Sequence, residues 1–145
     1  MFVRRGGVKV EKTEMKKRLQ GWGNAMERLG WKEEELKRLQ MFYGAQKEIW
    51  SSGAKEKREA ELEKIRREYN READRIRREM VEILQQKADI DRRIYRLNMD
   101  EEQFLRLRFE KGYGFDYIGV KMHLSRASLF RIQDRVLRKM MQEED

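Results

Sequence analysis

An apolar residue recurs at every seventh position along the middle of this chain. The repeat has six members without a gap: Leu62, Tyr69, Ile76, Ile83, Ile90 and Leu97. A strict seven-residue repeat keeps one stripe of a helix against a partner helix over its whole length. The pattern therefore predicts one long coiled-coil-like helix over residues 54–97. Burial of each large aliphatic side chain contributes about 1.5–3 kcal/mol, so this stripe needs a cover.

The composition favours an all-α fold. The chain has no proline, and about half of its residues are alanine, glutamate, lysine, leucine or arginine, as in long helices and coiled coils. The hydrophobic share of 39% is too small for a large core, so burial must come from narrow stripes on helices. Charged residues make up 43% of the chain, and the net charge is +8.

The N-terminal part predicts a short tail and two further helices. Residues 1–10 are basic and contain glycine, which is typical of a flexible tail. Steps of four and three then predict a helix through Met15, Leu19, Trp22, Met26 and Leu29. After Gly30-Trp31, a second helix is expected from Glu33 to Trp50, and Ser51-Ser52-Gly53 marks a turn. Residues 11–97 are therefore interpreted as a helical hairpin or coiled-coil oligomerisation region.

Two packing partners could bury the long apolar stripe. The helix from Glu33 to Trp50 can fold back on it, but it is less than half as long. The remainder, residues 76–97, then needs a second chain or the C-terminal part of the protein. We expect a homodimer through the long helix, and an intramolecular bundle is the alternative.

From residue 98 to residue 145 the pattern changes to three shorter helices. The first has acidic residues in its first turn and stops at Lys111-Gly112. In the second, Gly119 lacks a Cβ and would let two helices approach closely. His123-Leu124 forms the turn, and Ser125 is a natural N-cap for the last helix. Two short helices joined by a tight turn indicate a helix-turn-helix.

The last helix has two different sides at 100° per residue. An apolar side is formed by Leu129, Ile132, Val136 and Met140. The opposite side and its flanks carry Ala127, Phe130, Arg131, Asp134, Arg135 and Arg138. Residues 115–141 hold six basic and two acidic side chains, a local excess typical of nucleic-acid binding. Phe130 could contact a thymine methyl group or be buried against a neighbouring helix, and both interpretations stay open.

Residues 105–140 carry a resemblance to region four of bacterial sigma factors. The stretch reads LRLRFEKGYGFDYIGVKMHLSRASLFRIQDRVLRKM. Its matching features are the "LR-R-F" run, the glycine stop, the Ile118-Gly119 pair and the arginine spacing after Ser125. The resemblance implies a helix-turn-helix that reads duplex DNA. Residues 1–97 are unlike the rest of a sigma factor, because they form heptad helix instead of a polymerase-binding domain.

The resemblance also assigns DNA-contacting positions. It places base contacts at Arg126, Ala127, Phe130 and Arg131. It places Ser128 and Arg135 beside them, with Ser125 at the helix start. Lys121, Arg135 and Arg138 would supply salt-dependent phosphate contacts. The family usually has charged residues at the positions of Ala127 and Phe130, which argues against its usual promoter element as the target.

The order of a basic coiled-coil-like half and a sigma-like C-terminal unit resembles small bacteriophage late-gene regulators of the ArpU/RinA type. That resemblance implies a phage or prophage transcription regulator that binds double-stranded DNA in the bacterial cytoplasm. One alternative is a small terminase subunit marking phage DNA for packaging, although those proteins usually place the DNA-binding unit first. The other is an adaptor whose sigma-like unit contacts protein such as bacterial RNA polymerase.

Several other classes are disfavoured by the residue inventory. The chain has no cysteine and one histidine, His123, which leaves no pattern for a thiolate or histidine metal site or a Ser-His pair. We interpret His123 as a turn residue. No apolar run approaches the roughly 20 residues that cross a membrane. We therefore expect no catalytic residues, no cofactor, no metal and no membrane association.

Overall fold

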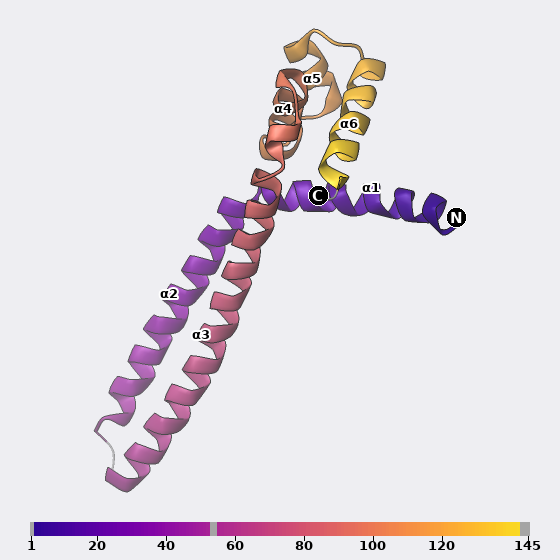
Figure 1. The fold of residues 1–145 in the computed structure, drawn as a ribbon. Coiled ribbons are helices and arrows are strands. Elements are labelled where there is room, and N and C mark those ends of the chain that lie inside the picture. The colour runs from indigo at the N-terminus through magenta and orange to yellow at the C-terminus, as the bar shows by residue number, and fades with distance from the viewer. Residues whose placement is uncertain (1, 53–54, 143–145) are drawn as a thin grey trace. The chain divides into compact units, whose positions relative to one another are not determined.

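The computed structural model describes residues 2–52 and 55–142, with side chains described for 11–52 and 56–142. The described residues form helices and no strand, which confirms the predicted all-α class (Figure 1). The elements in chain order are α1 (Phe2–Gly23), α2 (Ala25–Trp50), α3 (Lys55–Asp91), η1 (Ile94–Arg96), α4 (Met99–Leu105), η2 (Arg106–Glu110), α5 (Phe115–Met122) and α6 (Arg126–Met141). The turn η1 is a 3₁₀ helix and η2 is π-helical.

The chain divides into two compact units, and the division differs from the predicted boundary at residue 98. One unit joins the residues up to Ala25 with those from Leu84 onward, and we call it the helix-turn-helix unit. The other, Met26 to Ile83, is called the hairpin unit. The difference arises because the apolar stripe of α1 enters the core formed by the C-terminal helices. That core contains Met15, Leu19, Trp22, Ile90, Phe104, Leu105, Ile118, Leu129, Ile132, Val136, Leu137 and Met140.

The N-terminal helix is longer than predicted at its start. α1 begins at Phe2, whereas the sequence predicted a flexible tail over residues 1–10. Met1 and the side chains of residues 2–10 lie outside the described part of the chain. The helical backbone therefore extends through most of the segment that was assigned to the tail.

The break between the first two helices lies at Asn24, and the prediction of a break at Gly30-Trp31 is wrong. α2 runs through Gly30, because one glycine in a helix costs only about 1 kcal/mol relative to alanine. Gly23 has the stronger constraint. A Cβ at Gly23 would lie 1.8 Å from the carbonyl oxygen of Phe109, so α1 approaches η2 at a place where only glycine fits.

In the hairpin unit, α2 and the first part of α3 lie side by side and antiparallel (Figure 1). The rings of Tyr43 and Tyr69 stack with centroids 4.5 Å apart. Arg75 donates to Glu35 at 3.1 Å, and Lys32 donates to Glu79. The hydrogen bond from Arg75, and then that from Lys32, lowers the pKa of Glu35 below its ordinary value. The expected turn is present at Ser51-Ser52, whereas Gly53 lies outside the described residues.

The heptad stripe is covered within one chain. Ile76 and Ile83 are 1% and 6% exposed in the hairpin unit, and Ile90 is 1% exposed in the core of the helix-turn-helix unit. α3 ends at Asp91 instead of Leu97, where the indole Nε1 of Trp22 donates to the Asp91 carboxylate at 2.8 Å. A second chain is therefore not needed to cover this stripe, which was the reason for expecting a homodimer through it.

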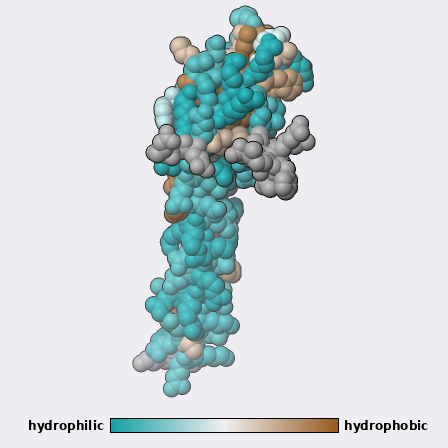
Figure 2. Space-filling view, turned by 45° about the vertical axis from the view of Figure 1, so that its right-hand side comes forward, coloured by the Kyte–Doolittle hydropathy of each residue, from teal (hydrophilic) through white to brown (hydrophobic). Residues whose placement is uncertain are grey.

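The outer surface of the hairpin carries mostly charged and polar side chains, together with several exposed large apolar ones on α2. Its face seen in Figure 2 is largely hydrophilic, with isolated apolar side chains. The exposed apolar residues of α2 include Trp31, Phe42 and Ile49, which are 62%, 61% and 72% exposed. None of the helices in the described ranges combines the length and the apolar character that crossing a membrane requires.

Candidate nucleic-acid interface

The turn between α5 and α6 has the geometry that the sequence predicted. His123 ends α5 in the left-handed region at φ 56° and ψ 44°, which histidine tolerates better than most residues. The backbone N–H of Leu124 donates to the carbonyl oxygen of Gly119 at 2.9 Å and closes the turn. The hydroxyl of Ser125 accepts from the backbone N–H of Ser128 at 3.1 Å, so Ser125 is the N-cap of α6.

Gly119 is a point of close approach, although the neighbour differs from the one expected. A Cβ there would lie 2.9 Å from the carbonyl oxygen of Leu124 and 3.6 Å from the Leu129 side chain. The turn's own backbone, more than a second helix, excludes a side chain at this position. Gly119 therefore sets the tightness of the connection that orients α6.

The buried side of α6 matches the predicted apolar side and extends beyond it. Leu129, Ile132, Val136 and Met140 are each no more than 4% exposed, as expected. Leu137 at 3% and Gln133 at 9% are also buried. The wider burial follows from α1, which packs against α6 in the same unit and brings Met15 and Leu19 into the shared core. A helical wheel of α6 alone contains no information about a helix that precedes it by more than a hundred residues.

The predicted reading side of α6 is exposed. Exposed side chains belong to Arg126, Ala127, Phe130, Arg131, Arg135 and Arg138, and Lys121 is exposed on α5. Ser128 is half-buried, and Ser125 is exposed at the helix start. The structure thus brings the candidate residues from Ser125 to Arg138 together at the start and on the outer side of α6, whereas Lys121 lies on α5. Burial of Arg126, Phe130 and Arg131 would have excluded this interface.

Arg131 is the cation at the centre of the outer side. Its guanidinium donates to the Ser128 hydroxyl at 3.1 Å, and Ser128 in turn lies 3.0 Å from the Ser125 hydroxyl. No acidic side chain forms an ion pair with Arg131 within the described residues. Its donors are therefore held near the start of α6 while its charge stays uncompensated.

Arg126 is the second cation at the start of α6. It contacts Asp116 at 3.3 Å, but the Asp116 side chain is 98% exposed. An ion pair this exposed contributes about 0–1 kcal/mol, so Arg126 can exchange Asp116 for an anionic partner at little cost. The guanidinium also lies 5.8 Å from the ring centroid of Phe130, which keeps it over the outer side of the helix.

Phe130 combines the two interpretations that the sequence left open. Its ring packs edge-to-face on Phe115 with centroids 4.7 Å apart, and Phe115 in turn meets the buried Phe104 at 5.9 Å. The side chain nevertheless remains 50% exposed. One part of the ring therefore belongs to an aromatic row that starts in the core, and the other part is available to a ligand.

Arg135 and Arg138 are less available than the sequence predicted. Arg135 contacts the Glu101 carboxylate at 3.3 Å, and Arg138 contacts Asp134 at 2.9 Å. Asp134 is also held by Lys12 of α1 at 2.6 Å. The hydrogen bond from Lys12 lowers the pKa of Asp134 below its ordinary value, against the opposing effect of burial. Part of the positive charge on the C-terminal half of α6 is thus neutralised inside the chain.

Glu101 is an important residue that the sequence interpretation missed. Its side chain is 1% exposed and accepts from Lys139 at 2.6 Å and from the backbone N–H of Asn98 at 2.9 Å. Burial alone would raise the pKa of Glu101, but Lys139, the Asn98 N–H and Arg135 together lower it below the ordinary value. The signal was present, because Asn98 followed three residues later by glutamate is a capping-box pattern.

Comparison with known proteins adds no relative. No protein-family model, no curated protein and no solved structure matches this chain. The resemblance of residues 105–140 to sigma region four therefore remains an expectation from the residues themselves.

Proposed function

We propose that this chain is a sequence-specific DNA-binding transcription regulator of phage or prophage type, which reads duplex DNA with α6. The observation that carries the proposal is the exposure of Arg126 and Arg131 at the start of a helix whose opposite side is buried. A helix presented in this way by a tight turn can enter the major groove with its N-terminal residues against base edges.

The chemistry of the exposed residues fits duplex recognition. Arginine can form two parallel hydrogen bonds to guanine, each such pair giving about 1–3 kcal/mol of discrimination. The methyl group of Ala127 and the exposed part of Phe130 can contact a thymine methyl group. Lys121 is exposed on α5, and we assign it a contact to a phosphate. Base reading and phosphate binding are thus assigned to different residues.

A gel-shift titration with random duplex DNA at about 50 and 200 mM salt tests the proposal. We expect binding at the lower salt that weakens steeply at the higher salt, because each phosphate contact releases counterions. The double variant Arg126→Ala, Arg131→Ala removes two cations from the proposed interface and should weaken the shift. The matched control Arg77→Ala, Arg78→Ala removes the same charge from exposed positions of the hairpin and should retain it. Absence of a shift at low salt for the wild-type chain would contradict the proposal.

The proposal includes a homodimer, but one that pairs through a surface other than the heptad stripe of α3. The stripe of α3 is already covered, whereas Trp31, Phe42 and Ile49 leave an apolar outer side on α2. We assign pairing of two copies to that side of α2. Light scattering should give twice the chain mass, and Phe42→Lys should convert the dimer to a monomer without loss of helix content. A monomer in the wild-type chain would contradict this assignment.

An adaptor that contacts protein is favoured by one observation. Val120 is 77% exposed and Tyr117 is 48% exposed on α5, and Phe130 is 50% exposed on α6. Exposed apolar residues that gather on one unit can mark a protein-binding surface. Bacterial RNA polymerase is the partner that the sigma-like resemblance implies. Pull-down of purified polymerase by the wild-type chain, lost in Val120→Asp, would support this second function.

A further inference from the structure

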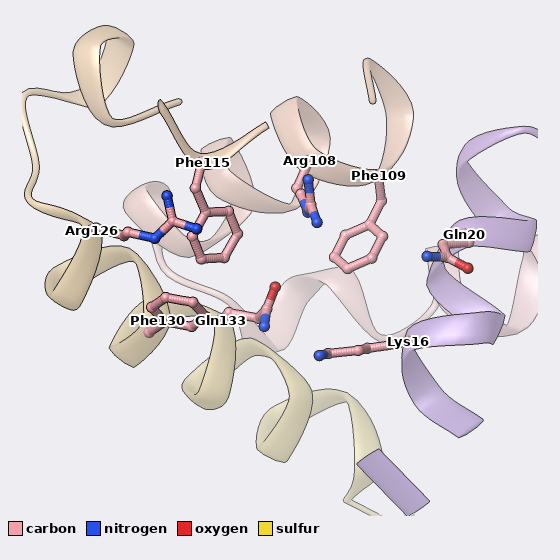
Figure 3. A pocket seen from close by; sticks show the side chains of 8 residues that line it. All are labelled: Lys16, Gln20, Arg108, Phe109, Phe115, Arg126, Phe130 and Gln133. Atoms are coloured by element: carbon pink, nitrogen blue, oxygen red, sulfur yellow. The ribbon is translucent and has the colours of Figure 1, made fainter. Parts of the chain in front are cut away.

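A groove lies beside the recognition helix and is built from four segments of the helix-turn-helix unit. It has a volume of about 450 Å³ and is lined by Lys16, Gln20, Arg108, Phe109, Phe115, Arg126, Phe130 and Gln133. Figure 3 shows α1 on one side and α6 on the other, with Lys16 and Gln20 extending toward α6. Volumes of about 300–1,000 Å³ are usual for small-ligand sites.

The groove is strongly cationic. Lys16, Arg108 and Arg126 line it, and no acidic residue does. Arg126 has the exposed Asp116 as a partner, and Arg108 donates to the carbonyl oxygen of Tyr113 at 3.0 Å. Neither Lys16 nor Arg108 forms an ion pair with any residue that the structure describes. A groove with this charge concentrates anions from solution.

Planar groups surround the same space. Phe109, Phe115 and Phe130 contribute rings, and the Arg108 guanidinium lies 5.1 Å from the centroid of the Phe115 ring. The Arg126 guanidinium lies 5.9 Å from the same centroid. Aromatic rings and guanidinium groups are the surfaces on which unpaired nucleobases stack in single-strand-binding proteins.

Gln133 is the most informative residue in the groove. It is 9% exposed, and its amide points from α6 into the groove (Figure 3). Within the described residues its side chain has no hydrogen-bond partner. The amide atoms open onto the groove and are not enclosed in the core, so water or a ligand group can hydrogen-bond them there. Gln20 offers a second amide from the side of α1.

We propose that this groove binds an unstacked nucleotide, with its phosphate at Lys16 and its base against the rings of Phe109 and Phe115. The Gln133 amide hydrogen-bonds the edge of the base. A base inside a duplex has its faces stacked and its pairing edge occupied, so this site is distinct in chemistry from duplex reading by α6. The nucleotide can belong to a single strand of DNA or be a free mononucleotide, because both present the same groups.

Two adjacent lysines of α1 provide a matched pair of variants. Lys16 lines the groove, whereas Lys17 does not, and both side chains are exposed. Lys16→Glu and Lys17→Glu change the charge of the chain equally. Gln133→Leu removes the amide and keeps an apolar group of similar size, and its thermal unfolding midpoint should equal or exceed that of the wild type.

Binding is measured by the fluorescence anisotropy of a labelled single strand of about ten nucleotides. We expect Lys16→Glu and Gln133→Leu each to weaken binding at least fivefold, as for loss of a base contact, and Lys17→Glu by no more than about twofold. Competition with unlabelled adenosine monophosphate then identifies the source. Displacement at similar concentrations points to a free nucleotide, and displacement by the unlabelled strand alone points to DNA.

Three results would overturn the proposal. The first is that Lys16→Glu and Lys17→Glu weaken single-strand binding equally. The second is that Gln133→Leu binds the strand as well as the wild type does. The third is that an unlabelled acidic peptide displaces the labelled strand at the same concentration as the unlabelled strand. Duplex binding is titrated in parallel with Arg131→Ala, which should weaken the duplex and leave the single strand unaffected. Loss of duplex binding and loss of single-strand binding are therefore measured separately, so either proposal can fail while the other holds.

Discussion

Lys139 of α6 donates a hydrogen bond of 2.6 Å to the carboxylate of Glu101 on α4, and that carboxylate is 1% exposed. The same carboxylate accepts from the Asn98 N–H that precedes α4 and from Arg135. A single acidic side chain thereby caps one helix and fixes a second one against it. The orientation of the proposed reading helix depends on this buried charge.

Replacement of Glu101 by glutamine should destabilise the helix-turn-helix unit. The amide keeps an acceptor for Asn98 but loses the charge that holds Lys139 and Arg135, and we expect a loss of about 1–3 kcal/mol. Urea unfolding followed by the fluorescence of buried Trp22, in a background with Trp31→Phe and Trp50→Phe, measures it. The control is Glu102→Gln. The Glu102 side chain is 43% exposed and pairs with Arg106, so its replacement should change the free energy of unfolding by less than about 1 kcal/mol. Equal effects of the two variants would contradict this role for Glu101.

The same carboxylate predicts a pH dependence. Its pKa in the folded chain lies below the ordinary value of 4.5, so its stabilising effect is present in full above about pH 4.5. Below pH 4.5 the unfolded state binds a proton at this carboxylate more readily than the folded state does, and this favours unfolding. The stabilising effect is therefore lost as the pH falls through the lowered pKa of the folded state. The difference in unfolding free energy between wild type and Glu101→Gln should therefore shrink below pH 4.5. A constant difference from pH 7 to pH 3 would argue against the ion pairs as its cause.

The glycines of the N-terminal half should respond oppositely to alanine. Gly23→Ala places a methyl group against the Phe109 carbonyl, and we expect a loss of about 1–3 kcal/mol as for other overpacked sites. A Cβ at Gly30 or Gly44 has no neighbour within 4 Å, so alanine there should stabilise α2 by about 0.5–1 kcal/mol. Thermal unfolding measured by circular dichroism separates the three variants. A stabilising Gly23→Ala would show that α1 does not approach η2 so closely.

The local features of the helix-turn-helix followed from short stretches of sequence. Ser125 as N-cap, His123 in the turn and the apolar side of α6 each depend on residues within a few positions of one another, and all were found. Such features reflect backbone hydrogen bonding and helical periodicity, which a sequence displays directly. The exposure of Arg126 and Arg131 followed from the same periodicity.

The contacts that joined distant segments were not visible in this way. Lys12 meets Asp134, and Trp22 meets Asp91, across long separations in sequence. Charged residues are so frequent in this chain that no spacing singles out one pair. The entry of α1 into the C-terminal core, and the groove beside Gln133 that results from it, could therefore be seen only in three dimensions.

Lys121→Ala should weaken binding to all duplex sequences by a similar factor. A phosphate contact carries no base information, and its loss should lower the slope of log affinity against log salt by about 1. Titrations of two unrelated duplexes over a range of salt concentrations measure both quantities. The control Lys64→Ala removes an exposed lysine from the hairpin and should leave the slope unchanged. A loss confined to one of the two duplexes would mean that Lys121 reads bases.

Selection of bound sequences from a random pool of duplex DNA tests the central claim most directly. The wild-type chain should enrich a defined motif, and Arg131→Ala should enrich the same motif with one position relaxed. Two half-sites in the motif would fit a pair of reading helices. A wild-type pool without any enriched motif, or an Arg131→Ala pool identical to it, would contradict reading of duplex DNA by the outer side of α6.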